Sequence, residues 1–290
     1  MSYELILGDR TFSSWSLRGW LMFEKFDIPC RTNFVGLYSG TFARDMANFA
    51  PARLVPAIRT PEGDVVGETM AIAETLAERH PDAGLWPVDP AARMFARWLA
   101  CEMHAGFGAL RDECPMQLVY QFQDFSVSNA VQANLDRLQE LWARAETQFG
   151  GDGPWLFGEY CLADVFFAPV AARIAGYGLP VSDDAGAYVK AHLADPAFRR
   201  WRAMGATKSY DPMPYALDLP TKDWPGPAPL AAKIAPSGPA ENTACPYSGD
   251  LLTDFMELDG RVFGFCNPFC RDKTVPDPAA WPAFMEIYQR

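Results

Sequence analysis

The sequence predicts a small α/β domain, then an all-α domain, then a small extension that contains a hairpin. Three observations support this prediction. The first eighty residues alternate short β-friendly runs with helical runs, in the order βαβ and then ββα. Residues 90–205 are almost continuously helical in their apolar periodicity. The last fifty residues contain the run ELDGRVFGF, in which Asp259-Gly260 is a typical hairpin turn.

The elements of the first domain follow from local patterns. Residues 3–8 form a run of β-friendly apolar residues, as in a buried strand. Apolar residues recur with a helical period over 17–25, and Ser13 or Ser14 is the expected N-cap of that helix. The other expected elements are a strand at 32–35, a short helix near 41–48, strands at 54–59 and 65–66, and a helix that begins at Glu68-Thr69 and ends near Pro81.

Proline-rich segments divide the rest of the chain. The stretch from Pro87 to Pro90 is the expected first domain break, and prolines between 212 and 239 predict an extended, irregular linker. Long amphipathic segments at 92–110 and 129–149, and a third helix from Leu162, lie between them. The predicted parts are a small α/β domain at 1–84, an all-helical domain at 90–208, a proline-rich linker at 209–243 and a cysteine-containing tail module at 244–290.

Composition excludes several classes of partner. The chain has 290 residues, of which 49% are hydrophobic and 21% charged, an ordinary globular balance. Its net charge of −11 repels phosphate, so we expect neither nucleic acid nor an anionic membrane as a partner. No apolar run approaches about 18 residues. The first ten residues lack the basic start and long apolar stretch of a signal peptide, so the expected location is cytoplasmic.

A serine pair follows the first expected strand. A hydroxyl at a helix N-terminus can donate a hydrogen bond, and the nearby backbone N–H groups and helix dipole favour a negative charge. A thiolate is such a charge, and its stabilisation would lower the pKa of a thiol from about 8.5 towards neutrality. The alternative is that the Ser13-Ser14 pair only caps the helix.

Two further pairs could hold a peptide-like ligand. A proline at a strand entrance, here Val55-Pro56, leaves neighbouring backbone groups free to pair with such a ligand. Glu68-Thr69 could hold an amino-acid end, because the helix start binds a carboxylate and Glu68 pairs with an ammonium group. Each pair has a structural alternative, an edge-strand proline and an ordinary helix start.

The three pairs in this order resemble the glutathione transferase superfamily over residues 3–205. The run Ser-Ser-Trp-Ser-Leu-Arg at 13–18 is similar to the Ser-Ser-Cys-Ser-x-Arg signature of the zeta class, with Trp15 in place of the cysteine. The resemblance implies a thioredoxin-like first domain and an all-α second domain. It also implies an activating hydroxyl at Ser13, with Ser14 as the alternative. Val55-Pro56 would then be the cis-proline that pairs with glutathione, and Glu68-Thr69 the pair that holds its γ-glutamyl end.

The helical half agrees with this resemblance. Residues 162–164 match the family's Ser/Thr-x-x-Asp capping box, with Cys161 where a hydroxyl is expected. The family binds its electrophile between the two domains, where His104 and Arg111 could line the acceptor pocket. These residues are seven apart, about two helical turns. The alternative is a structural histidine and a surface arginine. The resemblance also implies a homodimer.

The tail carries three of the seven cysteines, Cys245, Cys266 and Cys270, in a C-x20-C-x3-C pattern. Thiolates gathered by a turn, a hairpin and a helix start are typical of a zinc site. The pattern resembles small YHS/TRASH modules, and also a treble-clef finger in which Ser248 replaces a fourth cysteine. The alternative is that these are reduced, packed cysteines.

The resulting hypothesis is a glutathione-dependent transferase or isomerase that acts on a small electrophile. Ser13 would stabilise the glutathione thiolate, which attacks the electrophile. The alternative is a non-catalytic protein that binds glutathione or a metal on the same scaffold.

Overall fold

The computed structural model describes residues 2–290, which form two compact units. The first comprises residues 2–193 together with Tyr215–Pro225. The second comprises Ala194–Pro214 and Gly226–Arg290. Among the described residues, no helix is both long and apolar enough to cross a membrane.

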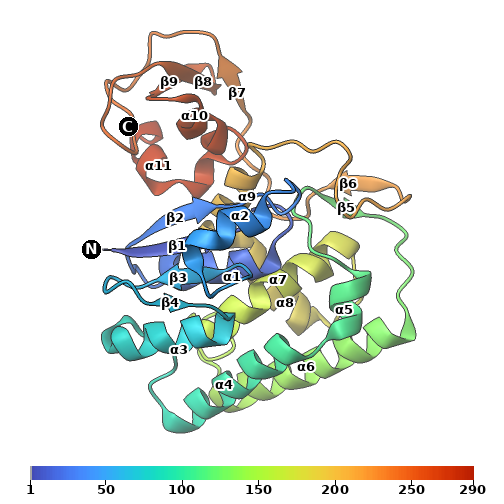
Figure 1. The fold of residues 1–290 in the computed structure, drawn as a ribbon. Coiled ribbons are helices and arrows are strands. Elements are labelled where there is room, and N and C mark those ends of the chain that lie inside the picture. Colours follow the sequence, from blue (N-terminus) through green and yellow to red (C-terminus); the bar gives the residue numbers. More distant parts are fainter. Residues whose placement is uncertain (1) are drawn as a thin grey trace. The chain divides into compact units, whose positions relative to one another are not determined.

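A four-stranded mixed sheet organises the first part of unit 1 (Figure 1). Its order is β2-β1-β3-β4, with β1 and β2 parallel and the other pairs antiparallel. This order confirms the mixed sheet that the sequence predicts. The strands are β1 (Tyr3–Leu7), β2 (Cys30–Phe34), β3 (Ala57–Arg59) and β4 (Val65–Val66).

Helices cover both faces of this sheet. Because side chains alternate along a strand, Ile6 and Leu7 point to opposite faces. On the Ile6 face, Met46 and Phe49 pack against the strands. Helix α1 lies on the other face, where a Cβ at Gly19 would be 3.6 Å from the Leu7 side chain. The helices of this part are α1 (Ser14–Glu24), α2 (Phe42–Met46), η1 (Ala47–Phe49), α3 (Thr69–Arg79) and η2 (Pro81–Ala83).

The rest of unit 1 is mainly helical, as predicted. Its helices are α4 (Pro90–Ala105), α5 (Gly108–Glu113), α6 (Asn129–Phe149), α7 (Leu162–Tyr177) and α8 (Asp183–Ala194). Nearly every residue of α7 is buried, and this helix contacts α1 and α4. Strand β5 (Tyr120–Phe122) pairs with β6 (Thr221–Asp223), so part of the segment expected to be an irregular linker forms a strand.

The start of α7 keeps its predicted capping box. The carboxylate of Asp164 accepts the backbone N–H of Cys161 at 2.9 Å and the hydroxyl of Tyr188 at 2.7 Å. A cysteine at the N-cap is therefore compatible with the motif, because the carboxylate supplies the stronger hydrogen bonds.

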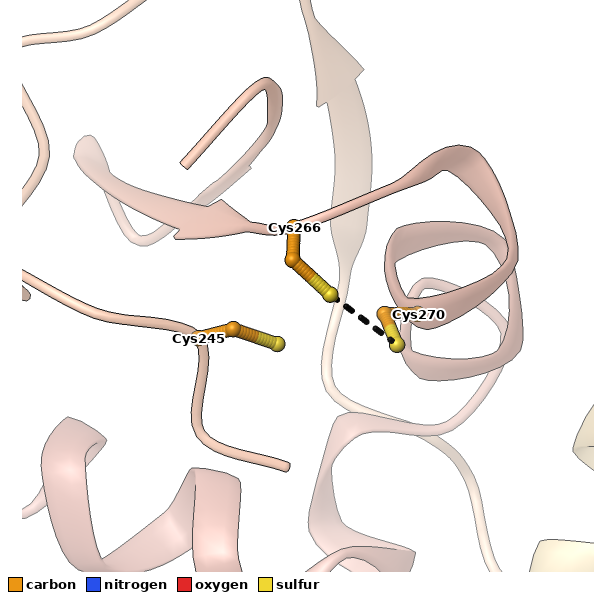
Figure 2. A group of neighbouring side chains, drawn as sticks. All are labelled: Cys245, Cys266 and Cys270. Carbon is orange, nitrogen blue, oxygen red and sulfur yellow. Dashed lines mark hydrogen bonds between the residues drawn. The ribbon is translucent and has the colours of Figure 1, made fainter. Parts of the chain in front are cut away.

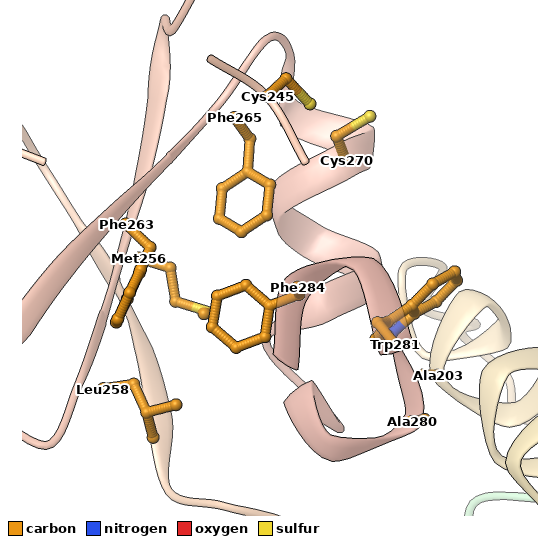
Figure 3. Close-up of a cluster of buried hydrophobic side chains, with 10 residues drawn as sticks. All are labelled: Ala203, Cys245, Met256, Leu258, Phe263, Phe265, Cys270, Ala280, Trp281 and Phe284. Atoms are coloured by element: carbon orange, nitrogen blue, oxygen red, sulfur yellow. The ribbon is translucent and has the colours of Figure 1, made fainter. Parts of the chain in front are cut away.

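Unit 2 is a three-stranded antiparallel sheet with short helices. Its elements are α9 (Pro196–Gly205), β7 (Ala232–Ala235), β8 (Asp254–Leu258), β9 (Arg261–Phe265), α10 (Pro268–Thr274), η3 (Pro278–Ala280) and α11 (Pro282–Tyr288). The predicted hairpin is β8–β9, with positive φ at both Asp259 and Gly260 as a tight hairpin turn requires. Figure 3 shows the core that the sheet and helices share, which includes Phe263, Phe284 and two cysteines.

Candidate functional site

The Ser13 hydroxyl caps helix α1, both as a hydrogen-bond acceptor and as a donor. Its Oγ accepts the backbone N–H of Ser16 at 3.2 Å and donates to Ser16 Oγ at 2.8 Å. Ser16 Oγ in turn accepts the N–H of Gly8 at 2.7 Å, which ties the helix start to the end of β1. Ser13 is 7% exposed. The proton that it would give to a bound thiolate is therefore already donated within the protein.

Ser14, the first residue of α1, lies in a different environment. It is half-buried, and its Oγ accepts a hydrogen bond from Arg173 Nη2 at 3.4 Å. Arg173 comes from α7 and is almost fully buried, with its Nε donating to the carbonyl of Cys114 at 2.9 Å. This contact leaves the Ser14 proton available, because the hydroxyl acts as the acceptor.

Three arginines gather around Ser14 and Trp15. The guanidinium carbon of Arg18 lies 4.3 Å from the centre of the Trp15 ring, and that of Arg111 lies 5.5 Å from it. Burial lowers the pKa of Arg173 to about 10, and the charge of Arg111 adds to this shift. Like charges held together in this way favour the arrival of an anion.

Arg18 is the most constrained of the three. It is 1% exposed, and its Nε donates to the carbonyl of Phe166 at 2.9 Å, while its Nη2 has no hydrogen-bond partner within residues 2–290. Burial lowers its pKa, and the charges of Arg173 and Arg111 lower it further. No salt bridge to any of the three arginines occurs within the described part of the chain.

His104 and Arg111 lie close together, but not two turns apart on one helix as their spacing suggested. His104 is in the last turn of α4, and Arg111 is in α5, after the chain breaks the helix at Gly106 and Phe107. The His104 ring makes an edge contact with Trp15 at 5.1 Å, and its Nε2 is 3.5 Å from a carboxylate oxygen of Glu68. Burial lowers the pKa of His104; Glu68 opposes this shift, and Arg18 and Arg111 reinforce it. Arg111 donates to the carbonyl of His104 at 3.2 Å. A neutral histidine and a cationic arginine therefore face Trp15.

The remaining residues of the predicted glutathione site lie at the ends of β3 and β4. The Val55-Pro56 bond is cis, and Pro56 is buried against α1. Glu68 has a φ of 63° and an exposed carboxylate, with 69% of its side chain accessible. Thr69 begins α3 and is only 2% exposed. Glu68 is thus open to a ligand, whereas the Thr69 side chain is packed inside.

The three tail cysteines come together in unit 2. Figure 2 shows their thiols converging from the turn after Cys245, the end of β9 and the first turn of α10. All three sulfurs lie within 4.8 Å of one another, and those of Cys266 and Cys270 are 3.9 Å apart. The sequence pattern thus identified a true cluster.

The thiols of the cluster differ in pKa. Burial alone would raise the pKa of Cys245, but N–H groups of Tyr247, Ser248 and Cys266 outweigh it and lower that pKa to about 7. Burial and the Cys266 side chain raise the pKa of Cys270 to about 12. The backbone N–H groups thus favour negative charge on the Cys245 sulfur, whereas burial disfavours it on the Cys270 sulfur.

Sequence reasoning missed two residues of the site in unit 1, Arg18 and Arg173. Arg173 stands inside the apolar run VFFAPVAARIAG, where an arginine is costly unless it is paired or functional. That isolated charge on a buried helix is the signal that could have identified it. Arg18 stands within the quoted serine motif, but its burial could not be read from spacing.

Comparisons with known proteins bear on the family and the fold of the chain. Residues 12–79 match the family described as glutathione S-transferase, N-terminal domain. A probable maleylacetoacetate isomerase of Caenorhabditis elegans is 33% identical over 110 residues, which are 38% of this chain and only half the length of that relative. The maleylacetoacetate isomerase of Pseudomonas aeruginosa is 29% identical over 153 residues, 52% of this chain and 71% of the relative.

Solved structures show the same fold. A glutathione transferase homolog from Burkholderia, crystallised with bound glutathione, superposes with a TM-score of 0.53 at 22% identity. The alignment covers 71% of this chain and 98% of that one. Glutathione transferase Omega 3C from Trametes versicolor gives a TM-score of 0.53 at 19% identity, over 70% of this chain and 88% of that one.

Proposed function

We propose that this chain is a glutathione-dependent transferase or isomerase of the glutathione S-transferase superfamily that acts on a small electrophile; the match of residues 12–79 to the N-terminal domain of that family and the maleylacetoacetate isomerases among its relatives support the proposal. The names of its relatives favour an isomerase, a reaction in which glutathione adds to the substrate and leaves again. The C–S bond that forms in the first step breaks in the second, so glutathione is regenerated. In a transfer reaction the C–S bond stays.

One observation carries this proposal: a half-buried serine hydroxyl at a helix N-terminus, with buried arginines beside it. Ser14 begins α1, where the helix dipole favours an anion. Arg173 lies 3.4 Å from its Oγ. A glutathione thiolate at this position would accept a hydrogen bond from the Ser14 hydroxyl, and the positive charges of the arginines would stabilise it. Each unit by which the pKa of the glutathione thiol falls corresponds to about 1.4 kcal/mol. We therefore propose Ser14, rather than Ser13, as the activating residue.

The rest of glutathione has candidate partners next to strands β3 and β4, at Val55-Pro56 and Glu68-Thr69. We propose that the exposed carboxylate of Glu68 binds the γ-glutamyl ammonium group. The N–H groups at the start of α3, at Thr69, would bind its α-carboxylate. The backbone of Val55 would pair with the cysteinyl part.

His104 and Arg111 are proposed to face the electrophile. Both lie next to the Trp15 ring, and burial keeps the histidine neutral beside the cationic arginine. When a thiolate adds to an activated double bond, negative charge develops on the substrate, and an adjacent guanidinium stabilises that charge. An electrophile that carries a carboxylate or carbonyl group fits this arrangement.

A non-catalytic protein that binds glutathione is the alternative. A homodimer and a cytoplasmic location also stay predictions that follow from the family resemblance and from composition. Measurements of turnover distinguish an enzyme from a non-catalytic glutathione-binding protein. Glutathione-dependent turnover should be screened with three classes of electrophile: cis-enoic dicarboxylates, haloacetates and nitroaryl halides.

If the protein is an enzyme, we expect turnover of at least one class of electrophile, and loss of that turnover in Ser14→Ala. Tight glutathione binding without turnover of any of them favours the binding protein.

A further inference from the structure

We propose that Cys245, Cys266 and Cys270 bind one thiophilic metal ion as three thiolates, with the fourth coordination position left to solvent or an outside ligand. The site belongs to unit 2 and uses no residue of the glutathione site. Zn²⁺ and Cu⁺ share the chemistry that these ligands select, because soft thiolates prefer both.

The distances fit such an ion. Two thiolates on a tetrahedral zinc ion, each about 2.3 Å from it, lie about 3.8 Å apart. The sulfurs of Cys266 and Cys270 are already 3.9 Å apart, and all three sulfurs lie within 4.8 Å of one another. The other two pairs of sulfurs need to approach by at most about 1 Å to reach that spacing. Figure 2 shows the three sulfurs gathered in one place.

The backbone holds the three residues in place. Cys245 is fixed by a turn in which its N–H donates to the carbonyl of Asp250 at 2.9 Å and its carbonyl accepts the N–H of Gly249. Cys266 follows β9 directly, and Cys270 lies in the first turn of α10. The cluster therefore sits on a strand end, a turn and a helix start that the core in Figure 3 supports.

Two polar side chains donate to the Cys266 sulfur, which distinguishes this cluster from cysteines packed as small apolar residues. Ser248 Oγ donates to Cys266 Sγ at 3.3 Å, and Asn267 Nδ2 donates to the same sulfur at 3.1 Å. The Asn267 amide is oriented by its cap bond, since its Oδ1 accepts the N–H of Cys270 at 2.9 Å. Donors around metal-bound thiolates orient them and offset their charge.

Within residues 2–290, no histidine or carboxylate completes the group. Three thiolates held this closely would repel one another, and a cation removes that cost. Three protein ligands with an open position are typical of sites that exchange or use their metal, whereas closed structural zinc sites have four. The tail is thus assigned a metal site that can accept an outside ligand.

The test uses the full-length, reduced protein with Zn²⁺ in one arm and buffered Cu⁺ in the other. Alkylation of each cysteine is followed by mass spectrometry with and without metal. We expect one ion per chain in at least one arm, and at least 10-fold slower alkylation of all three tail cysteines. The exposed Cys101 serves as an internal control whose rate does not change.

Single-residue variants provide a second, independent test. Cys245→Ser and Cys270→Ser should each weaken metal binding at least 100-fold, Ser248→Ala about 10-fold, and Cys101→Ser not at all. The wild-type alkylation experiment needs no variant, so a variant that fails to fold does not remove the test. Equal alkylation rates with and without either metal, or stoichiometric binding that survives Cys245→Ser, would overturn the proposal.

Discussion

The hydroxyl of Ser13 donates to Ser16 Oγ at 2.8 Å, so it is committed to the start of α1. The hydroxyl of its neighbour Ser14 accepts a hydrogen bond from Arg173, so its own proton stays available for a hydrogen bond to a ligand. Two adjacent serines thus differ in role: one holds the helix, and the other faces the arginines. The sequence pattern favoured Ser13 for activation, and the hydrogen bonds favour Ser14.

This difference predicts opposite phenotypes for two neighbouring substitutions. Ser13→Ala removes an N-cap and should cost about 1 kcal/mol of folding stability, with turnover largely retained at temperatures where the protein is folded. Ser14→Ala should keep stability and lower kcat at least 10-fold. Thermal melts and steady-state kinetics measured on both variants check this. The reverse pattern would assign activation to Ser13.

The predictions from sequence held where they rested on local patterning and failed where they needed distant contacts. The first sheet and the hairpin at Asp259-Gly260 follow from alternation and turn residues, and the structure confirms both. The pairing of β5 with β6 joins two three-residue segments about 100 residues apart, which no local periodicity reveals. Likewise, Arg173 reaches Ser14 across 159 positions. Such a contact depends on how α7 packs on α1.

A second prediction concerns the close approach of α1 to the cis-proline turn. A Cβ at Gly19 would lie 2.6 Å from Pro56 Cβ and 2.8 Å from Pro56 Cγ, so one backbone must shift. Gly19→Ala should therefore destabilise the protein by about 1–3 kcal/mol and weaken glutathione binding.

The matched control is Gly186→Ala in α8, where nothing lies within 4 Å of the new methyl group. It should be neutral or stabilise by roughly 0.5–1 kcal/mol, as alanine does within a helix. Chemical denaturation of both variants gives the comparison. An unchanged midpoint for Gly19→Ala would contradict the packing described here.

The third prediction tests the ammonium partner of glutathione. Glu68→Gln keeps the shape of the side chain and removes its charge, so glutathione should bind about 10-fold more weakly. Glu78→Gln, an exposed change on α3, should leave the Kd unchanged. Calorimetric titration of both variants with glutathione decides it. Equal loss in both would indicate a general effect of net charge.

The fourth prediction concerns stability at low pH. His192 is 1% exposed and lies against Trp155 and Tyr188. Burial, helped by the charge of Lys25, lowers its pKa to about 3. The unfolded chain takes up this proton near pH 6.5 and the folded chain does not. Stability is therefore fully present above about pH 6.5 and falls as the pH is lowered towards 3, by up to roughly 1.4 kcal/mol per pH unit.

A neutral replacement should remove that part of the slope. His192→Gln is expected to flatten the free energy of unfolding between about pH 6 and 4, relative to its own value at pH 8. Denaturant titrations at several pH values measure this. An identical slope in wild type and variant would show that His192 does not titrate differently in the two states.

The most direct test of the central claim is the ionisation of bound glutathione, followed by thiolate absorbance as a function of pH, together with calorimetric binding to wild type and Ser14→Ala. We predict that wild type binds glutathione and lowers the pKa of its thiol by at least one unit. Ser14→Ala should still bind it but lose most of that shift. If glutathione binds to neither protein, or if its thiol titrates identically in both, the assignment of this site is contradicted.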